Sequence, residues 1–335
     1  MTCTAVMNRR RALLYAGALF SLVVLVVLSL CLGAVRLSPT TLLEALHGDE
    51  TSAAYKILRY VRLPRTVAAL LCGVALASSG AIIQSVLHNP LGSPNVLGMN
   101  AGAGLAGLVC AAWLPAATFA LPLAAFFGAF CTLLLVCALG KKAGGAKASV
   151  LLAGVAVSTF FTALADCIIV LIPDTIYSRA GFKIGSLSGV QLAVLAPAAI
   201  VIALSFAVAF ALRHEFDVLA LGDESAQSLG LPVGAVRLAA LVLAALLCGA
   251  GISFTGLVGF VGLIVPHCAR FFVGSSMKAL LPLSALLGAV LVLLCDLLSR
   301  LLFAPYELPV GILLSLIGGV FFIVLLLREK KARYD

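Results

Sequence analysis

The feature that most constrains this chain is a series of long runs without Asp, Glu, Lys or Arg. Seven such runs of 17 residues or more contain 215 of the 335 residues. They occupy residues 12–35, 66–140, 148–165, 184–212, 238–269, 279–295 and 308–327. Because a bilayer crossing takes roughly 20 to 25 residues of α-helix, these runs predict nine or ten transmembrane helices. The strands of an outer-membrane barrel alternate apolar and polar residues, so uninterrupted runs exclude that architecture.

Composition excludes two other classes. Only 10% of the residues are charged, whereas a soluble domain carries about 25%. The net charge of +9 comes from Lys and Arg residues spread over loops and termini, with no basic helix or aromatic platform for a nucleic acid.

The ten cysteines contain no C-x-x-C pair and lie mostly in apolar runs, where a thiol behaves as a small hydrophobe. We therefore predict neither a disulfide framework nor a metal site.

The 75-residue run 66–140 is too long for two helices. It is interrupted by the sequence HNPLGSP at 88–94 and by Leu114-Pro115, both of which are turn signals. We therefore expect three helices in this run, near 66–87, 95–113 and 118–139.

The run 238–269 is ambiguous, because 32 residues at 1.5 Å per residue would form a helix about 48 Å long. We predict that it divides at the glycine-rich stretch Gly249–Gly256 into one normal and one short helix, which makes ten in total. Broken backbone at membrane depth is tolerated only when it is buried in protein or lines a cavity. An even number also places the basic clusters 9–11 and 328–333 on one side, and both prefer the cytoplasm.

The expected protein is thus an all-α, multi-pass transmembrane domain spanning residues 1–335, with both termini cytoplasmic in the cytoplasmic membrane. In this topology the inside loops hold 14 Lys and Arg against 8 outside. The first outside segment is an exception, since it holds five: Arg36, Lys56, Arg59, Arg62 and Arg65. Either a long segment tolerates this charge, or the segment forms an outward basic surface for an acidic partner.

Residues 213–237 are the longest polar stretch on the predicted cytoplasmic side. Asp223 can cap a short helix that Gly230 closes before Pro232. A helix of about seven residues is marginal in water by itself. It therefore either packs on the ends of its own membrane helices or docks into another protein, and the residues alone leave both open.

Groups that could carry chemistry are sparse. Asp166 and Asp296 follow uncharged runs of 18 and 17 residues, so both are expected near outward helix ends in reach of water, which argues against a proton relay at mid-membrane. The motifs H-E-x-x-H, G-x-S-x-G and G-x-x-x-x-G-K-[ST] do not occur. We therefore expect a protein that is not an enzyme, binds no ATP and holds no cofactor of its own.

Small residues recur at close-packing spacings in the second and third predicted helices, for example at Gly73, Ala77 and Gly80 and from Gly98 to Gly107. Such faces let two helix backbones approach closely. The alternative is a wide path lined by small side chains, as a bulky solute would need.

Several long motifs also occur in order between residues 60 and 325. They are Arg62-Leu-Pro-Arg65, Gly80-Ala-Ile-Ile-Gln84, His88 to Pro94, Leu97 to Ala103, Leu221 to Gly230, Gly256 to His267 with Arg270, Asp296 to Arg300, and Glu307 to Gly311. Together they resemble the FecCD-type permeases, which are the membrane subunits of ABC importers for iron-siderophores, haem and cobalamin. Gly318-Gly-Val320 and Ser275 to Lys278 depart from the family's pattern, which affects local detail only.

The resemblance implies a type II ABC importer permease architecture with ten helices per subunit. It implies a second permease copy, identical or different, two ATP-binding subunits that use ATP and Mg, and an extracytoplasmic substrate-binding protein. Positions matching the family's docking arginines for that protein are Arg62, Arg65 and Arg300. Those matching its ATPase-coupling element are Leu221, Gly222, Asp223, Ala226, Leu229, Gly230 and Pro232. Those matching its translocation gate are Gln84, Asn89 and Leu91.

The expected function is that of a permease subunit that moves an iron-siderophore or a related chelate, such as haem or cobalamin, across the cytoplasmic membrane. An ion-gradient-driven secondary transporter is the alternative, because it also uses many spans and broken helices. It would need a carboxylate or an ion cage at mid-membrane, and the sequence suggests neither. A channel is a weaker alternative, since no filter motif occurs. The residues do not identify the chelate.

Overall fold

The computed structural model describes residues 3–33, 35, 37–38, 40–41, 52–114, 119–144, 147–172, 181–302 and 306–331. Arg36 of the predicted outside cluster lies outside these residues. The helices are α1 Cys3–Cys31, α3 Ala53–Ile57, the π-helical η1 Leu58–Arg62, α4 Leu63–Leu87, α5 Met99–Trp113, α6 Ala120–Lys142, α7 Lys147–Leu171, α9 Leu192–Ala211, α10 Arg213–Leu219, α11 Asp223–Ser228, α12 Val233–Thr255, α13 Val261–Val273, α14 Met277–Leu301 and α15 Val310–Lys331.

The described residues contain seven helices that are long and apolar enough to cross a membrane, of which α3, η1 and α4 together form one. Three shorter apolar segments, in α5, α13 and α15, complete the set. The all-helical, multi-pass fold class and the ten predicted membrane helices are therefore confirmed.

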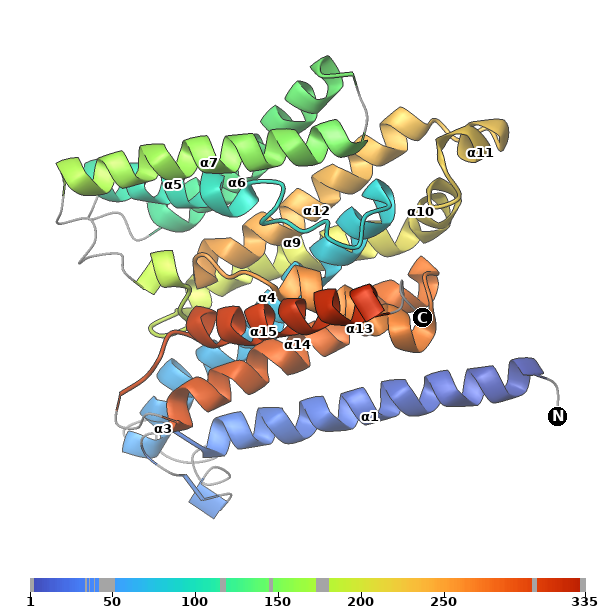
Figure 1. Ribbon diagram of the computed structural model, residues 1–335. Helices are drawn as coiled ribbons and strands as arrows, with labels where there is room; N and C mark the ends of the chain where they lie inside the picture. Colours follow the sequence, from blue (N-terminus) through green and yellow to red (C-terminus); the bar gives the residue numbers. More distant parts are fainter. Residues whose placement is uncertain are drawn as a thin grey trace.

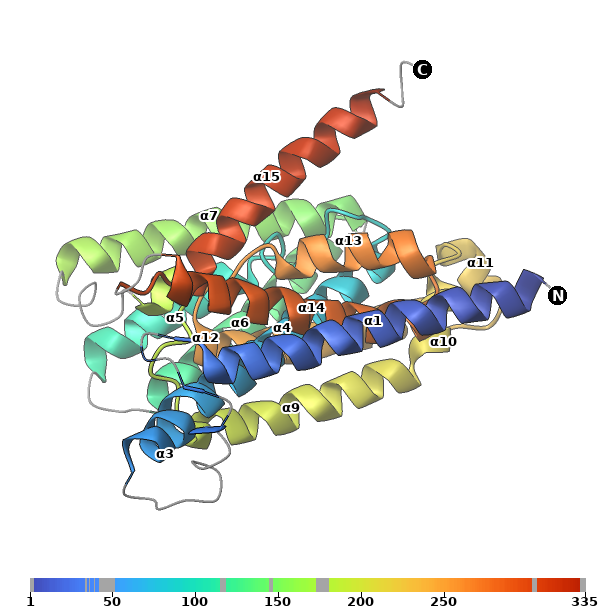
Figure 2. The ribbon, with the colours of Figure 1, turned by 90° about the horizontal axis from the view of Figure 1, so that it is seen from below.

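Helix α4 lies at the centre of the bundle and packs against α14, α12 and α13. In its span 78% of the most apolar window is buried, against 6% for α1 and 17% for α7. Figure 2 shows α1 and α9 along one side and α15 extending away from the other helices toward its C-terminal end. Since lipid is as apolar as a leucine side chain, helices at the periphery need no further cover to be stable in a membrane.

The two ends of the bundle differ in what they carry. Figure 1 shows the start of α1 and the end of α15 at the same end as α10 and α11, whereas α3 lies at the opposite end. Following the predicted orientation, we call the first the inner end and the second the outer end. The short helices α10 and α11 belong to the polar stretch 213–237, which we call the docking segment.

The small residues of α4 and α5 lie where helices cross. A side chain at Gly73 would overlap the backbone of Gly288 in α14, and one at Gly80 would overlap the backbone of Gly262 in α13. In α5, a side chain at Gly102 would overlap the side chain of Thr132 and the carbonyl of Gly128 in α6. These three glycines serve close helix packing, so the structure favours packing over a wide path at these positions.

The run 238–269 divides into α12 and α13 as predicted, and the break comes at the C-terminal end of the predicted stretch Gly249–Gly256. Helix α12 continues through Gly249 and Gly251, which pack against α6 and α4, and ends at Thr255. The break comes at Gly256, with φ of 74°, and α13 starts after Phe260, with φ of 65°. The break therefore lies within the predicted stretch Gly249–Gly256, at its last residue, because Gly249 and Gly251 allow close approach of helices while Gly256 takes the positive φ that ends one.

The broken backbone is paired within the protein. The N–H of Leu257 donates to the carbonyl of Phe182 over 2.9 Å, and the N–H of Ser186 donates to the carbonyl of Thr255 over 2.9 Å. The segment before α9 thus supplies hydrogen bonds that a continuous helix would have made itself. This satisfies the condition under which irregular backbone is stable at membrane depth.

Candidate functional site

A compact group of charged side chains lies at the outer end, where α4 and α14 meet. Nε of Arg65 donates to Oδ1 of Asp296 over 2.8 Å, and Nη1 of Arg65 donates to Oε2 of Glu307 over 2.5 Å. The side chain of Asp296 is fully buried, whereas that of Glu307 is 38% exposed. We call Arg62, Arg65, Asp296, Arg300 and Glu307 the outer charge cluster.

Arg300 completes the pairing of the buried carboxylate from the same helix. Its Nη2 lies 3.0 Å from Oδ2 of Asp296 as an ion pair, outside hydrogen-bond geometry. The same nitrogen donates to Oγ of Ser29 in α1 over 2.8 Å. One buried carboxylate is thus shared by two guanidinium groups, which offsets its desolvation.

Arg62 belongs to the cluster by position but pairs differently. Its guanidinium donates to the carbonyls of Leu30 and Val35, in the segment that leaves α1. The residue is buried, with 4% of its surface exposed. It therefore ties the end of α1 to the start of α4 instead of extending into solvent.

These positions correct two expectations. Asp296 lies near the outer end of α14 as expected, but it is buried in ion pairs and not in reach of water. Asp166 is exposed as expected and pairs with exposed Lys183. Arg62 and Arg65 do not contribute to the predicted outward basic surface, because both are buried and bonded within the chain, and Arg300 is buried in the same way. Of the predicted outside cluster, Lys56 and Arg59 are exposed. The docking role of the three arginines stays a prediction.

The docking segment forms two short helices joined by Ala220 to Gly222. Leu221 and Leu229 are 64% and 66% exposed, although both are apolar and lie beside polar residues. Ala226 between them is fully buried against the rest of the chain. Helix α11 therefore uses Ala226 to pack on the rest of its own chain, and the ATPase-coupling role of Ala226 stays a prediction.

Asp223 does not cap α11 as predicted, because Gly222 occupies the cap position and Asp223 is the first helical residue. The carboxylate instead accepts a hydrogen bond from Nη2 of Arg237 over 2.6 Å and lies 3.1 Å from Nζ of Lys147. The hydrogen bond from Arg237, helped by Lys147, lowers the pKa of Asp223. Gly230, with φ of 81°, follows the end of α11 before Pro232, which confirms that part of the prediction.

The predicted gate residues lie at or near the inner turn, which we define as residues 88–94 between α4 and α5. Gln84 is buried, and its Nε2 donates to the carbonyls of Gly262 and Leu263 while its Oε1 accepts from Arg270 over 2.5 Å. It therefore fixes α13 to α4. A gating role for it remains a prediction.

Asn89 and Leu91 lie in the inner turn itself. The N–H of Leu91 donates to Oδ1 of Asn89 over 2.8 Å, which closes a local turn. Leu91 is 45% exposed. The turn thus carries an exposed apolar tip on a frame that is held by hydrogen bonds, and its gating role is likewise a prediction.

Sequence reasoning did not single out three residues that complete these sites. Glu307 and Ser29 hold the arginines of the outer charge cluster, and Lys147 joins the docking segment to the start of α7. Glu307 was noted only as the first residue of the motif Glu307 to Gly311, without a role as an ion-pair partner. No sequence signal pointed to Ser29 or Lys147.

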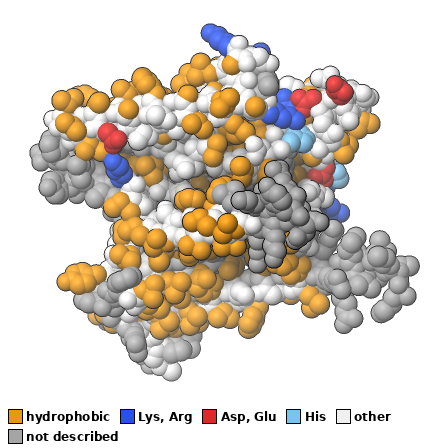
Figure 3. Space-filling model, viewed as in Figure 1, with side chains coloured by type: hydrophobic (Ala, Val, Ile, Leu, Met, Phe, Trp, Pro, Cys, Tyr) orange, Lys and Arg blue, Asp and Glu red, His pale blue; other side chains and the backbone are white. Residues whose placement is uncertain are grey.

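The surface matches a protein embedded in lipid. Figure 3 shows hydrophobic side chains over much of the visible face, with charged side chains gathered mainly at the inner end around α11. A multi-pass helical membrane protein with a polar segment of short helices at one end is the class that this architecture defines.

Comparison with known proteins specifies the class further. The chain is 38% identical over 312 residues to the iron(3+)-hydroxamate import system permease protein FhuB of Bacillus subtilis (strain 168), covering 91% of this chain and 80% of the relative. It is 36% identical over 327 residues to the hemin transport system permease protein HmuU of Yersinia pestis, covering 94% and 96%. The FecCD transport family matches residues 21–328. The chain belongs to this family.

A solved structure supports the same assignment. It is described as an inward-facing conformation of a metal-chelate type ABC transporter, and it superposes with a TM-score of 0.84 at 28% identity, covering 95% of this chain and 99% of the other. The predicted family resemblance is therefore confirmed at the level of both sequence and fold.

Proposed function

We propose that this chain is the permease subunit of an ABC importer that moves a ferric chelate or haem into the cytoplasm. The observation that carries the proposal is the docking segment, which presents exposed Leu221 and Leu229 on short helices at the inner end. A chain without a P-loop has no recognisable means of binding ATP, so the energy has to reach it from a partner. Family membership supplies the class of that partner.

The proposed assembly has two permease copies, two ATP-binding subunits beneath them and a substrate-binding protein at the outer end. ATP and Mg would be held by the ATP-binding subunits. Both termini would be cytoplasmic, since α1 starts and α15 ends at the end that carries the docking segment. The basic residues of that end support this orientation. Relatives that carry iron(3+)-hydroxamate, hemin, Fe(3+)-citrate and ferric enterobactin support an iron-containing solute.

In this mechanism the chain performs no bond chemistry. ATP binding in the partner subunits moves the docking segment, and the helices tilt between outward-open and inward-open states. Nucleotide and loaded binding protein bias these states only through their different affinities for each. Helices α12 and α13 are joined by a hydrogen-bonded irregular segment, which lets the two halves change their angle without exposing unpaired backbone.

An ion-gradient-driven transporter is the second candidate, favoured by the same break between α12 and α13. The two candidates differ in their energy source. We expect vesicles holding the assembled complex to accumulate 55Fe-labelled ferric hydroxamate, ferric citrate or haemin when ATP and the binding protein are supplied, and not on a sodium or proton gradient alone. Gradient-driven uptake by the permease alone would reject the proposal.

The docking surface is tested with two variants and a control. Leu229→Asp and Leu221→Asp should abolish most ATP-driven uptake and release the ATP-binding subunit during purification, because a carboxylate would enter an apolar interface. Leu302→Asp is the matched control, since Leu302 is 57% exposed at the outer end. Retention of the ATP-binding subunit by both inner variants would show that it docks elsewhere.

A further inference from the structure

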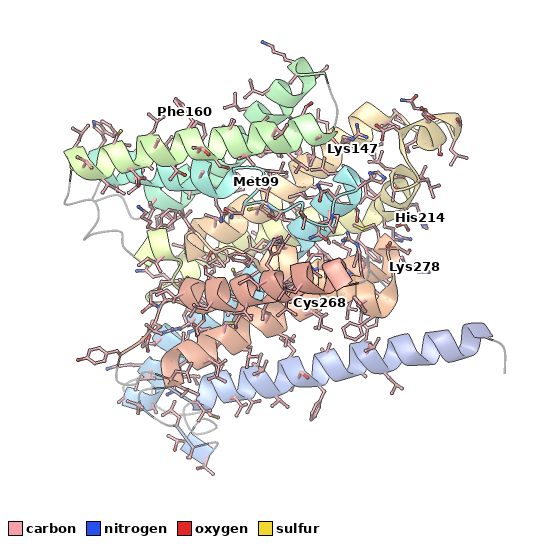
Figure 4. The ribbon with its side chains drawn as sticks, viewed as in Figure 1. Met99, Lys147, Phe160, His214, Cys268 and Lys278 are labelled. Carbon is pink, nitrogen blue, oxygen red and sulfur yellow. The ribbon has the colours of Figure 1, made fainter. Side chains whose placement is uncertain are left out.

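One ammonium group lies between the docking segment and the inner turn. Nζ of Lys147 donates to Nδ1 of His88 over 2.8 Å, and the same Nζ lies 3.1 Å from Oδ1 of Asp223. Lys147 is the first residue of α7. Three elements distant in sequence therefore meet at a single cation, at the inner end of α7 where Figure 4 labels Lys147.

On the side of the inner turn, the contact is made at a constrained residue. His88 is the residue at which α4 ends, with φ of 50°, and its N–H donates back to the carbonyls of Gln84 and Ser85. Few residues other than glycine adopt this conformation without cost. Because His88 immediately precedes Asn89, a displacement of its ring also displaces the start of the inner turn.

On the side of the docking segment, the contact is made at a carboxylate that is held firmly. Arg237 of α12 donates to the same Oδ1 of Asp223 over 2.6 Å. The side chain of Lys147 is 27% exposed and that of Asp223 is 40% exposed. Such a pair stabilises the fold only slightly, so its position between the docking segment and the inner turn is more informative than its strength.

We propose that Lys147 is a positioning residue that transmits displacement of α11 to the inner turn, through His88 on one side and Asp223 on the other. Its role in transport rests on the proposed function, in which α11 receives force from the ATP-binding subunit. The transmission of displacement from α11 to the inner turn does not rest on the proposed function, because it depends only on contacts within this chain. The two statements are therefore tested separately.

The first experiment uses the purified full-length chain in detergent and measures amide hydrogen exchange by mass spectrometry. Asp223→Asn should speed exchange about threefold or more in the inner turn, which Asp223 does not itself contact, because a coupling residue changes such equilibria by roughly 0.5 to 2 kcal/mol. In a Lys147→Met background the same Asp223→Asn substitution should produce no further change there. Glu224→Gln is the control, since it removes the neighbouring charge from an exposed side chain of α11.

An effect of Asp223→Asn confined to residues 213–237 would overturn the inference, as would an equal effect in the Lys147→Met background.

The second experiment uses the assembled complex and compares ATP hydrolysis with and without loaded binding protein. Lys147→Met should reduce the stimulation about three- to tenfold, and Lys147→Arg, which keeps a cation, should restore much of it. Lys141→Met, an exposed lysine at the end of α6, should retain full stimulation.

The two experiments fail in different ways. If the wild-type complex shows no ATP-driven uptake while the exchange result holds, the proposed function fails and the transmission through Lys147 stands. If uptake is driven by ATP but Lys147→Met keeps full stimulation, the proposed function stands and Lys147 has no positioning role.

Discussion

The outer charge cluster and the docking segment are both built from ion pairs, yet they use charge in opposite ways. In the cluster, Asp296 is fully buried and shared by Arg65 and Arg300, which are themselves buried. In the docking segment, Asp223 is 40% exposed and shared by Lys147 and Arg237. The first group is closed within the protein, whereas the second remains in contact with water and beside exposed leucines.

This difference separates fold from function. Removing one member of a buried ion group leaves an uncompensated charge out of water, which lowers the free energy of unfolding of the whole protein. Removing one member of an exposed group leaves a charge that water solvates, so the cost is small. Changes at the outer cluster should therefore alter stability, and changes at the docking segment should alter interactions with partners.

The largest effect is expected for Asp296→Asn. It leaves Arg65 and Arg300 facing a single remaining carboxylate, that of Glu307, and should lower the free energy of unfolding by about 3 to 5 kcal/mol. Thermal unfolding of the purified chain in detergent measures this. Asp166→Asn is the matched control, because Asp166 and its partner Lys183 are both exposed, and a change below about 1 kcal/mol is expected. Equal melting temperatures for the two variants would contradict the distinction between the two regions.

A second variant sharpens the result at the cluster. Replacing the buried carboxylate and its two guanidinium partners by apolar residues, with Arg65→Met, Asp296→Leu and Arg300→Met together, should destabilise less than Asp296→Asn alone. The reason is that apolar replacements leave no buried charge unpaired. A triple variant that melts well below the single one would mean that the hydrogen bonds to α1 contribute more than the pairing of charges does.

The next effect concerns Ala226, which is buried in the docking segment. Ala226→Asp should place a carboxylate among apolar side chains and unfold α11 locally, at a cost of roughly 1 to 3 kcal/mol. Faster hydrogen exchange limited to residues 213–237 in the isolated chain is the expected readout. Leu229→Asp should leave that exchange unchanged, because its side chain already faces water. Similar exchange in the two variants would show that α11 does not have a buried and a free face.

The membrane helices were predictable because hydrophobicity alone specifies them, and the order of the spans follows from the long uncharged runs. The closure of the outer charge cluster was not predictable, because Arg65 and Asp296 lie 231 residues apart in the sequence. The exact break between α12 and α13 was hidden because a glycine that allows close packing and one that ends a helix look the same in sequence. Gly249 and Gly256 are such a pair.

Within the docking segment, polarity and helix-ending residues predicted a short helix, and α11 lies there. Which of its side chains are buried was not predictable, since Ala226 and Leu229 differ only in tertiary contacts. The motifs contain Arg65 and Arg300, but no local pattern reveals that Arg65 pairs with Glu307 and that Arg300 donates to Ser29.

A smaller effect is expected at the exposed part of the outer end. Lys56→Glu with Arg59→Glu should slow association of the binding protein several-fold at low ionic strength, because rim charges act mainly on the association rate. The difference should vanish at high salt. Surface-bound permease and soluble binding protein allow this measurement. An unchanged association rate would mean that Lys56 and Arg59 take no part in binding and that the outside segment only tolerates their charge.

The smallest effect on stability is expected at Asp223. The pH dependence of the free energy of unfolding shows whether the ionised carboxylate of Asp223 stabilises the fold. Hydrogen bonding from Arg237, with Lys147 in support, lowers the pKa of Asp223 below its ordinary value of 3.8. A lowered pKa in the folded state means that the ionised group contributes stability above that ordinary value, and that the contribution is lost as pH falls through the folded pKa. Asp223→Asn should therefore cost under about 1 kcal/mol near neutral pH, and the wild-type protein should lose this small advantage only in strong acid. If Asp223→Asn instead melted as early as Asp296→Asn, the docking segment would be part of the structural core, and the contrast between a closed outer cluster and an open inner one would not hold.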